Sequence, residues 1–309
     1  MTGAADQFVH PALFYRDQRE YLAGVVPFVR TALAAGEAVA VAVPTENLRL
    51  LKEEIGAGAA VRFLDMREAG RNPGRIIPNV LRAFADAQPP GTRVSIVGEP
   101  IWAGRTATEY PACVQHEALI NAAFRGRDAT ILCPYDTRRL DPQVVADAYA
   151  THPVVVDADS GRERPSARYD FEAVHSRYNE PLPPAPDVPA HAFVADVLGE
   201  ARHLAKDAGA RLGLVRPRLD DLALAVAELT TNSVLHGGGA GVLRVWAEDG
   251  YVVCEVRDKG QLTDLLAGRR PPSRDQRGGR GLLIVNLVAD LVRVHAGPDG
   301  TTVRCWFAC

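Results

Sequence analysis

In the first half of the chain, apolar runs alternate with segments whose apolar residues recur at helical spacing. The strand-like runs cover residues 37–43, 61–66, 94–99 and 129–133. Helices are predicted over residues 17–35, 46–55, 77–87 and 110–124. Alternation of this kind is typical of βαβ units and of a parallel sheet covered on both faces. We therefore expect an α/β domain in this half.

The last third of the chain follows a different order. Apolar positions Leu222, Val226 and Leu229 recur at helical spacing and predict an amphipathic helix over residues 220–235, ended by glycines. An Asp-Gly pair between two β-rich runs predicts a hairpin. The later apolar run predicts a buried helix, and a last strand follows a turn. These segments cover residues 242–246 and 251–257 for the hairpin, 282–292 for the helix and 301–307 for the strand.

A proline-rich segment separates these two patterns. Residues 181–189 hold five prolines and should form an extended, semi-rigid connector. A chain of 309 residues also exceeds the usual size of a single domain. We expect domains at residues 1–180 and 190–309, joined by this linker.

Charge and hydropathy exclude two classes of protein. The net charge of −3 does not suit a general nucleic-acid binder, which tends to be basic, so we expect no direct nucleic-acid partner. No apolar run has the length of a membrane span, and the N-terminus has no secretory leader pattern. We expect a cytoplasmic protein without a membrane partner.

The cysteines give no ligand pattern in the sequence. Their number is odd and no CxxC pair occurs, so neither a disulfide framework nor a zinc motif is indicated. We expect reduced thiols and no structural metal. The five residues are Cys113, Cys133, Cys254, Cys305 and Cys309.

Three segments near the end of the chain carry candidate chemistry. Glu228 and Asn232 are four residues apart in the predicted helix, so a carboxylate and an amide share one helical face. Asp258 follows a strand, and Gly260 lets backbone approach whatever Asp258 binds. Gly281 opens an apolar helix whose N-terminal N–H groups suit phosphate. An irregular polar loop lies between Gly260 and Gly278. Together these segments form a pattern that indicates a nucleotide site.

With ELTTN at residues 228–232, DKG at 258–260 and GGRGLLIVN at 278–286, the chain from Pro189 onward resembles the GHKL, or Bergerat-fold, ATPases. Within them it resembles the anti-sigma-factor serine kinases. The resemblance implies an α+β domain with helices on one face of a mixed sheet, and ATP with Mg²⁺ as cofactors. It implies Glu228 as general base and Asn232 as Mg²⁺ ligand. The implied ATP-binding residues are Asn232, His236, Asp258, Gly260, Gly279, Arg280, Gly281, Leu282 and Thr301.

Two features of the loop before Gly281 bear on turnover. The family's DxGxG motif has a second glycine where this chain has Leu262, which puts the hinge of a mobile lid in question. Arginines in and beside the loop would neutralise charge on a transferred phosphoryl group, and one or two of them would suffice. These arginines are Arg269, Arg270, Arg274, Arg277 and Arg280.

The first 180 residues resemble the MEDS sensory domain, a RecA-like fold without a phosphate loop. The matching features are His10 with residues 13–15, the Gly36-Glu37 pair, the helix at 113–121 and residues 133–136. No GxxxxGK[ST] run occurs, which excludes a P-loop site. The resemblance implies sensing of a small molecule, and ligands of open α/β sheets bind beyond the C-terminal strand ends. The candidate pocket residues are His10, Tyr15, Glu99, Trp102 and Tyr135.

Three functions remain open at this point. The first is a serine kinase of the anti-sigma type, with a sigma factor and an anti-anti-sigma (STAS-type) protein as partners and a small-molecule signal. The second is a non-catalytic, nucleotide-binding adaptor that sequesters a partner. The third is a sensor histidine kinase with His203 as phosphoacceptor, which the short helix around His203 disfavours. A homodimer is left open.

Overall fold

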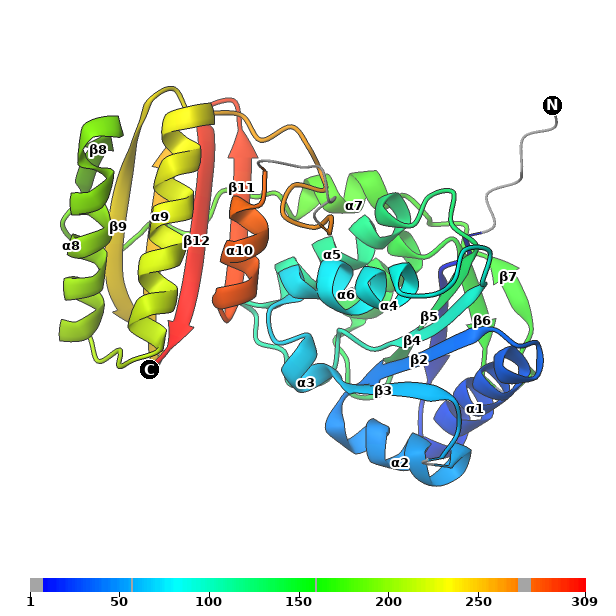
Figure 1. Cartoon of the computed structure of the whole chain (residues 1–309). Helices are drawn as coiled ribbons and strands as arrows, with labels where there is room; N and C mark the ends of the chain where they lie inside the picture. Colours follow the sequence, from blue (N-terminus) through cyan, green and yellow to red (C-terminus); the bar gives the residue numbers. More distant parts are fainter. Residues whose placement is uncertain (1–7, 57, 159, 272–278) are drawn as a thin grey trace. The chain divides into compact units, whose positions relative to one another are not determined.

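The computed structural model describes residues 8–56, 58–158, 160–271 and 279–309. These residues form two compact units, Met1–Tyr178 and Asn179–Cys309. Figure 1 shows the first unit in blue to green and the second in green to red. Each unit has its own sheet, helices and core, and each is described separately below.

The first unit is built on a sheet of seven described strands in the order β3-β2-β4-β5-β1-β6-β7. All neighbouring strands are parallel except β6 and β7. The expectation of a parallel α/β domain is therefore confirmed in its main feature. The strands are β1 Pro11–Tyr15, β2 Ala38–Val43, β3 Val61–Asp65, β4 Val94–Gly98, β5 Ala129–Asp136, β6 Val154–Asp157 and β7 Glu163–Pro165.

The helices of this unit begin and end where local chemistry sets them. Asp17 caps α1 because its carboxylate accepts a hydrogen bond from the Glu20 amide at 2.9 Å. The segment expected as one helix over residues 77–87 is helical from Ile76 to Asp86, with a π-helix at Ile76–Arg82 that continues directly into the short α4. The other helices are α1 Gln18–Ala34, α2 Thr45–Ile55, α3 Met66–Ala69, a 3₁₀ turn at Pro73–Arg75, α4 Ala83–Asp86, α5 Tyr110–Ala123, α6 Pro142–Thr151 and α7 Phe171–Arg177.

The core of the first unit lies on both faces of its sheet. In β2 every residue from Val39 to Val43 is buried, as in strands that are covered on both sides. Side chains of α1 and α2, including Val25, Val29 and Leu51, pack against this strand. A polar group in such a sheet is therefore removed from water unless it lies at a strand end.

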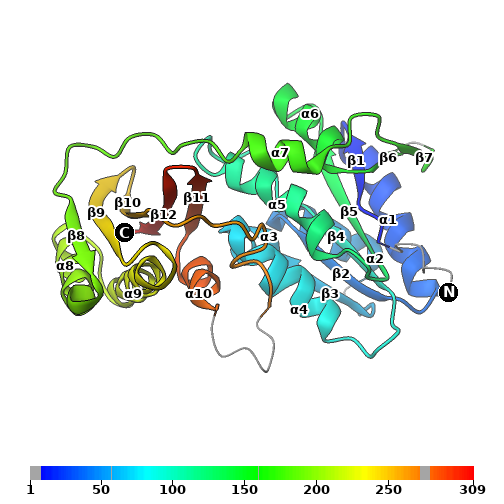
Figure 2. The ribbon, with the colours of Figure 1, turned by 90° about the horizontal axis from the view of Figure 1, so that it is seen from above.

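The second unit has a sheet in the order β11-β12-β10-β9-β8, with three helices on one face (Figure 2). Every described pairing is antiparallel, so the expectation of a mixed sheet is wrong. The reason is that β12 inserts between β10 and β11, which run in the same direction. The elements are β8 His191–Val194, a 3₁₀ turn at Ala195–Val197, α8 Leu198–Arg211, α9 Arg218–His236, β9 Ala240–Glu248, β10 Tyr251–Asp258, α10 Gly281–Val288, β11 Leu291–Gly297 and β12 Gly300–Ala308.

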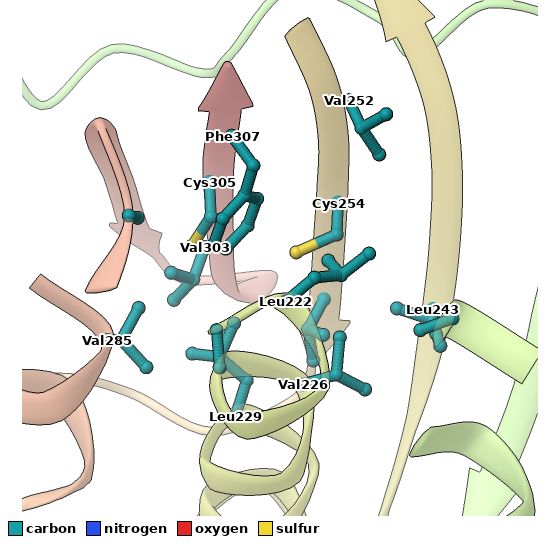
Figure 3. Close-up of a cluster of buried hydrophobic side chains, with 14 of the residues drawn as sticks. Leu222, Val226, Leu229, Leu243, Val252, Cys254, Val285, Val303, Cys305 and Phe307 are labelled. Atoms are coloured by element: carbon teal, nitrogen blue, oxygen red, sulfur yellow. The ribbon is translucent and has the colours of Figure 1, made fainter. Parts of the chain in front are cut away.

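Helix α9 forms the centre of the second core. Its Leu222, Val226 and Leu229 are buried against the sheet, where Cys254 and Phe307 face them (Figure 3). Fully burying one such side chain contributes roughly 1.5–3 kcal/mol. This packing fixes the rotation of α9 and so determines where its polar residues point.

The apolar run over residues 282–292 is divided between two elements, which corrects the expectation of one helix. Helix α10 ends at Val288, Ala289 is extended, and β11 begins at Leu291. Between them, the Asp290 carboxylate accepts hydrogen bonds at 2.6 Å from Arg218 and at 2.7 Å from the Ala308 amide. These long-range bonds anchor the chain where the helix stops.

The proline-rich segment lies against the sheet of the second unit. Asn179 exchanges hydrogen bonds with the Ala296 backbone, and the Pro183 carbonyl accepts one at 2.7 Å from Arg304. Arg304 is buried and also bonds the Glu255 carboxylate. The segment is thus held by specific polar contacts.

Candidate functional site

The second unit contains a cavity of about 410 Å³ beside the C-terminal half of α9, the end of β10 and the start of α10. Most of the residues expected to bind ATP line it. Those on the wall are Asn232, His236, Asp258, Gly260, Gly279, Gly281, Leu282 and Thr301. Glu228 and Arg280 are not on the wall.

Asp258 is held in one orientation at the end of β10. The Ser233 hydroxyl donates a hydrogen bond to its Oδ2 at 2.6 Å, and the Gly260 amide donates to its Oδ1 at 2.8 Å. The Thr301 hydroxyl in turn donates to the Gly260 carbonyl at 2.7 Å. A half-buried carboxylate fixed in this way is suited to accept hydrogen bonds from an exocyclic amino group.

Glu228 and Asn232 lie on one face of α9, next to the first residue of α10. A Cβ atom on Gly281 would lie 2.8 Å from Asn232 Nδ2 and 3.0 Å from Glu228 Oε2. The absence of a side chain at Gly281 therefore leaves the space in which a carboxylate, an amide and a helix N-terminus meet. Carboxylate and amide oxygens are hard ligands of the kind Mg²⁺ prefers.

Gly260 is required by close packing at the other end of the cavity. A Cβ there would approach the His236 carbonyl to 2.5 Å and Gly237 Cα to 2.7 Å, and both are backbone atoms. Any side chain at this position would displace the C-terminus of α9 or the loop that carries Asp258. The residues present therefore fit a nucleotide with Mg²⁺: an oriented acceptor, a metal-ligand pair and glycine walls.

The loop between β10 and α10 is described in part. Leu262 is half-buried and lines the cavity, at the position where the expected motif has glycine. Arg270 forms an ion pair with Asp264 at 2.6 Å, Arg269 is buried, and Arg280 is exposed. Arg274 and Arg277 lie outside the described residues.

The first unit contains a larger cavity, of about 730 Å³, at the C-terminal ends of its strands. Tyr15, Glu99 and Trp102 line it, as expected for an open α/β sheet. Tyr21 and Asn47 also line it, although no motif in the sequence marks them. Tyr21 and Asn47 join this cavity through their hydrogen bonds to Glu99, which lies far from them in the sequence.

Glu99 is the buried titratable group of this cavity. The Asn47 amide donates to its two oxygens at 3.1 and 2.8 Å, and the hydroxyls of Tyr15 and Tyr21 donate at 3.3 and 3.5 Å. Burial outweighs these bonds and raises the pKa of Glu99 to about 8. Burial thus favours the uncharged form of the Glu99 carboxyl up to about this pH.

His10 and Tyr135 do not line this cavity, contrary to the grouping expected from the sequence. Both are buried elsewhere in the unit, where their rings pack against His152 with centroid distances of 4.0 and 5.5 Å. Burial and the neighbouring His152 lower the pKa of His10 to about 4. These two residues therefore belong to a separate buried cluster.

Comparisons with known proteins assign each unit to a domain family. Residues 9–153 match the family model of the MEDS domain, described as the methanogen/methylotroph, DcmR sensory domain. Residues 194–307 match that of the histidine kinase-like ATPase domain. The search of curated proteins gives no match. The chain thus combines a sensory-type domain with an ATPase-type domain that implies nucleotide binding.

One solved structure with similarity is that of the RsbU and RsbW domains of Rv1364c from Mycobacterium tuberculosis, at 20% identity and a TM-score of 0.29. The match covers 39% of this chain and 32% of that one, so the chain spans about a third of that protein's length. Similarity at this level adds nothing to the assignment of either unit.

None of the helices in the described part of the chain is long and apolar enough to cross a bilayer.

Proposed function

We propose that this chain is a regulatory serine kinase of the anti-sigma type, which binds ATP with Mg²⁺ in its second unit. The match of residues 194–307 to the histidine kinase-like ATPase domain supports the nucleotide. The observation that carries the proposal is the position of Gly281 beside the cavity that Asp258 lines. A Cβ atom placed on Gly281 would lie within 3.0 Å of the side chains of Glu228 and Asn232.

Each of these residues has a distinct role in the proposed reaction. Asp258 accepts hydrogen bonds from the adenine amino group, and the amide oxygen of Asn232 holds Mg²⁺. Glu228 accepts the proton of a serine hydroxyl on the partner as that oxygen attacks. Bound ATP would supply the γ-phosphoryl group, with ADP leaving as the bond from the γ-phosphorus to the bridging oxygen breaks, and Mg²⁺ would neutralise the charge, so positioning by the protein is the main requirement.

The first unit supplies the signal in this proposal. The match of residues 9–153 to a sensory domain supports a small-molecule ligand, and the 730 Å³ cavity offers the space for one. The signal changes kinase activity to the extent that the ligand binds two states of the protein with different affinity.

The partners in the proposal are an anti-anti-sigma protein of the STAS type, which carries the serine, and a sigma factor that the kinase sequesters. A second candidate function is a nucleotide-binding adaptor without turnover. Leu262 favours it, because this side chain occupies the cavity wall where the kinases have glycine.

The test is transfer of label from [γ-³²P]ATP to STAS-type proteins of the same organism. With Glu228→Gln we expect the rate of transfer to fall by about 10³-fold, since a general base contributes roughly 10²–10⁴. Glu200→Gln, on an exposed position of α8, is the matched control and should retain the rate.

Two outcomes would overturn parts of this proposal. Transfer that survives Glu228→Gln would remove the role given to Glu228. Tight binding of Mg²⁺-ATP with no transfer and no hydrolysis would favour the adaptor.

A further inference from the structure

Four side chains that the nucleotide and sensory sites do not use meet inside the first unit. They are His10 directly before β1, Glu117 on α5, Cys133 on β5 and His152 at the end of α6. All four are buried, with at most 1% of each exposed. One ligand atom from each lies within 4.8 Å of the others. The pairing of Ala12 with Cys133 across β1 and β5 brings His10 beside the thiol.

Three of the six distances between these atoms match a tetrahedral metal site. Nε2 of His10 and Nε2 of His152 each lie 3.3 Å from Glu117 Oε2, and Cys133 Sγ lies 3.4 Å from His10 Nε2. Metal–ligand bonds of about 2.0–2.3 Å place the ligand atoms of a tetrahedral zinc site roughly 3.3–3.7 Å apart. The cluster therefore has the dimensions of a coordination shell.

The hydrogen bonds of His10 direct one ring nitrogen toward the cluster. Asn121 donates from Nδ2 to the carbonyls of Ala118 at 3.1 Å and Thr151 at 2.8 Å, which fixes its Oδ1 as the acceptor opposite His10 Nδ1. Nδ1 of His10 therefore carries the hydrogen, and Nε2 presents its lone pair to the cluster. In metal sites, the ring nitrogen of a histidine that does not bind the metal typically donates a hydrogen bond to such an acceptor.

His152 is oriented in the same way. Its Nδ1 lies 2.8 Å from the Ala148 carbonyl, so that nitrogen donates and Nε2 faces Glu117. Among the described residues, His152 Nε2 and both oxygens of Glu117 have no hydrogen bond of adequate geometry. Two ring lone pairs and an unsatisfied carboxylate thus converge in the dry interior, where unpaired polar groups are costly.

We propose that His10, Glu117, Cys133 and His152 bind a zinc ion in the first unit. A closed set of four protein ligands with two nitrogens, one sulfur and one oxygen suits tetrahedral Zn²⁺. On binding, the Cys133 S–H bond breaks, its proton passes to solvent and the thiolate bonds the metal. The site is independent of the kinase proposal.

This proposal departs from the expectation of a chain without a structural metal. Zinc motifs are recognised in sequences by short ligand spacings, such as two cysteines separated by two residues. Here the ligands are at positions 10, 117, 133 and 152, so only the folded sheet brings them together. No spacing rule applied to the sequence detects such a set.

The experiment uses the full chain with Cys309→Ser as background, because Cys309 is the exposed thiol. The protein is stripped with a chelator under reducing conditions and titrated with Co²⁺, followed by Zn²⁺. We expect one Co²⁺ per chain, tetrahedral visible bands, a thiolate-to-cobalt charge-transfer band in the near ultraviolet, and displacement by Zn²⁺.

Two cysteine variants make the test specific. Cys133→Ser should lose the charge-transfer band and bind Zn²⁺ at least about 10-fold more weakly. Cys113→Ser, which changes another buried cysteine of the same unit, should keep both. A charge-transfer band that persists in Cys133→Ser, or is lost in Cys113→Ser, overturns the assignment.

Circular dichroism of each variant establishes that it is folded. If Cys133→Ser does not fold, the background protein alone decides the question. Absence of the tetrahedral bands together with absence of stoichiometric zinc by mass spectrometry then overturns the proposal, and presence of both supports it.

Discussion

The two units of this chain place their polar chemistry in different environments. In the first unit, Glu99 directly after β4 and Glu117 on α5 are at most 3% exposed. In the second, Glu228 and Asn232 are half-buried beside Gly281, and Asn232 lines the cavity. The first arrangement holds its groups in fixed positions, and the second leaves room for a nucleotide and for a reacting hydroxyl.

The difference follows from the two kinds of sheet. Helices cover both faces of a parallel sheet, so polar groups inside it lose their contact with water. The antiparallel sheet of the second unit carries its helices on one face, and its cavity lies at the ends of α9 and β10. We therefore expect burial to control protonation in the first unit and the open space beside Gly281 to control nucleotide binding in the second.

The largest expected effect tests the burial of Glu99. Its pKa of about 8 lies above the ordinary 4.5, so the folded state favours the protonated form. The contribution of this group to stability is complete below pH 4.5 and is lost as pH rises toward 8. At about 1.4 kcal/mol per pH unit, the loss is on the order of 5 kcal/mol.

The measurement is the free energy of unfolding of wild type and Glu99→Gln, from denaturant titrations between pH 4.5 and 8.5. We expect wild type to lose stability relative to the variant as pH rises. Glu54→Gln, at an exposed position of α2, should give a difference that does not vary in this way. A constant difference between wild type and Glu99→Gln would show that burial does not control this carboxyl.

A smaller effect tests the role of space in the second unit. The added methyl of Gly281→Ala would meet the ends of the Asn232 and Glu228 side chains at 2.8 and 3.0 Å. Because these ends can shift, the fold should survive while the affinity for Mg²⁺-ATP falls by about 10-fold, or about 1.4 kcal/mol.

The matched control is Gly199→Ala in α8, where a Cβ meets nothing within 4 Å. Fluorescence titration with a labelled ATP analogue compares the two variants. Equal affinity in both would mean that the space beside Gly281 is not used by the nucleotide.

Local patterns predicted the elements that are long and amphipathic. Helices α1, α2 and α9 follow the expected ranges because their apolar positions recur on one face, whereas α5 follows its range although it is buried on nearly every side. The hairpin of β9 and β10 was predicted from its Asp249-Gly250 turn, and both residues have positive φ. Apart from Asn286 and Asp290 the run at 282–292 is apolar, so its periodicity cannot locate the break at Asp290.

The candidate sites divide in the same way. Glu228, Asn232 and Asp258 could be named as candidates from the sequence because they lie in short motifs with regular spacing. The sequence did not indicate Ser233, which lies 25 positions before Asp258 and donates a hydrogen bond to its carboxylate. It also did not indicate the hydrogen bonds from Asn47 to Glu99 or the grouping of His10 with Glu117, Cys133 and His152. These contacts join strands and helices that are distant in the sequence, so they leave no local pattern.

The central claim is that the second unit binds ATP with Mg²⁺ through Asp258. Calorimetric titration of Mg²⁺-ATP into the full chain tests it most directly, with Asp258→Asn as the variant and exposed Asp207→Asn on α8 as the control. We predict one ATP per chain and an affinity about 10- to 100-fold lower in Asp258→Asn, since a hydrogen bond to a charged group contributes roughly 1.5–3 kcal/mol. No binding by the wild type, or equal affinity in Asp258→Asn, would contradict the claim.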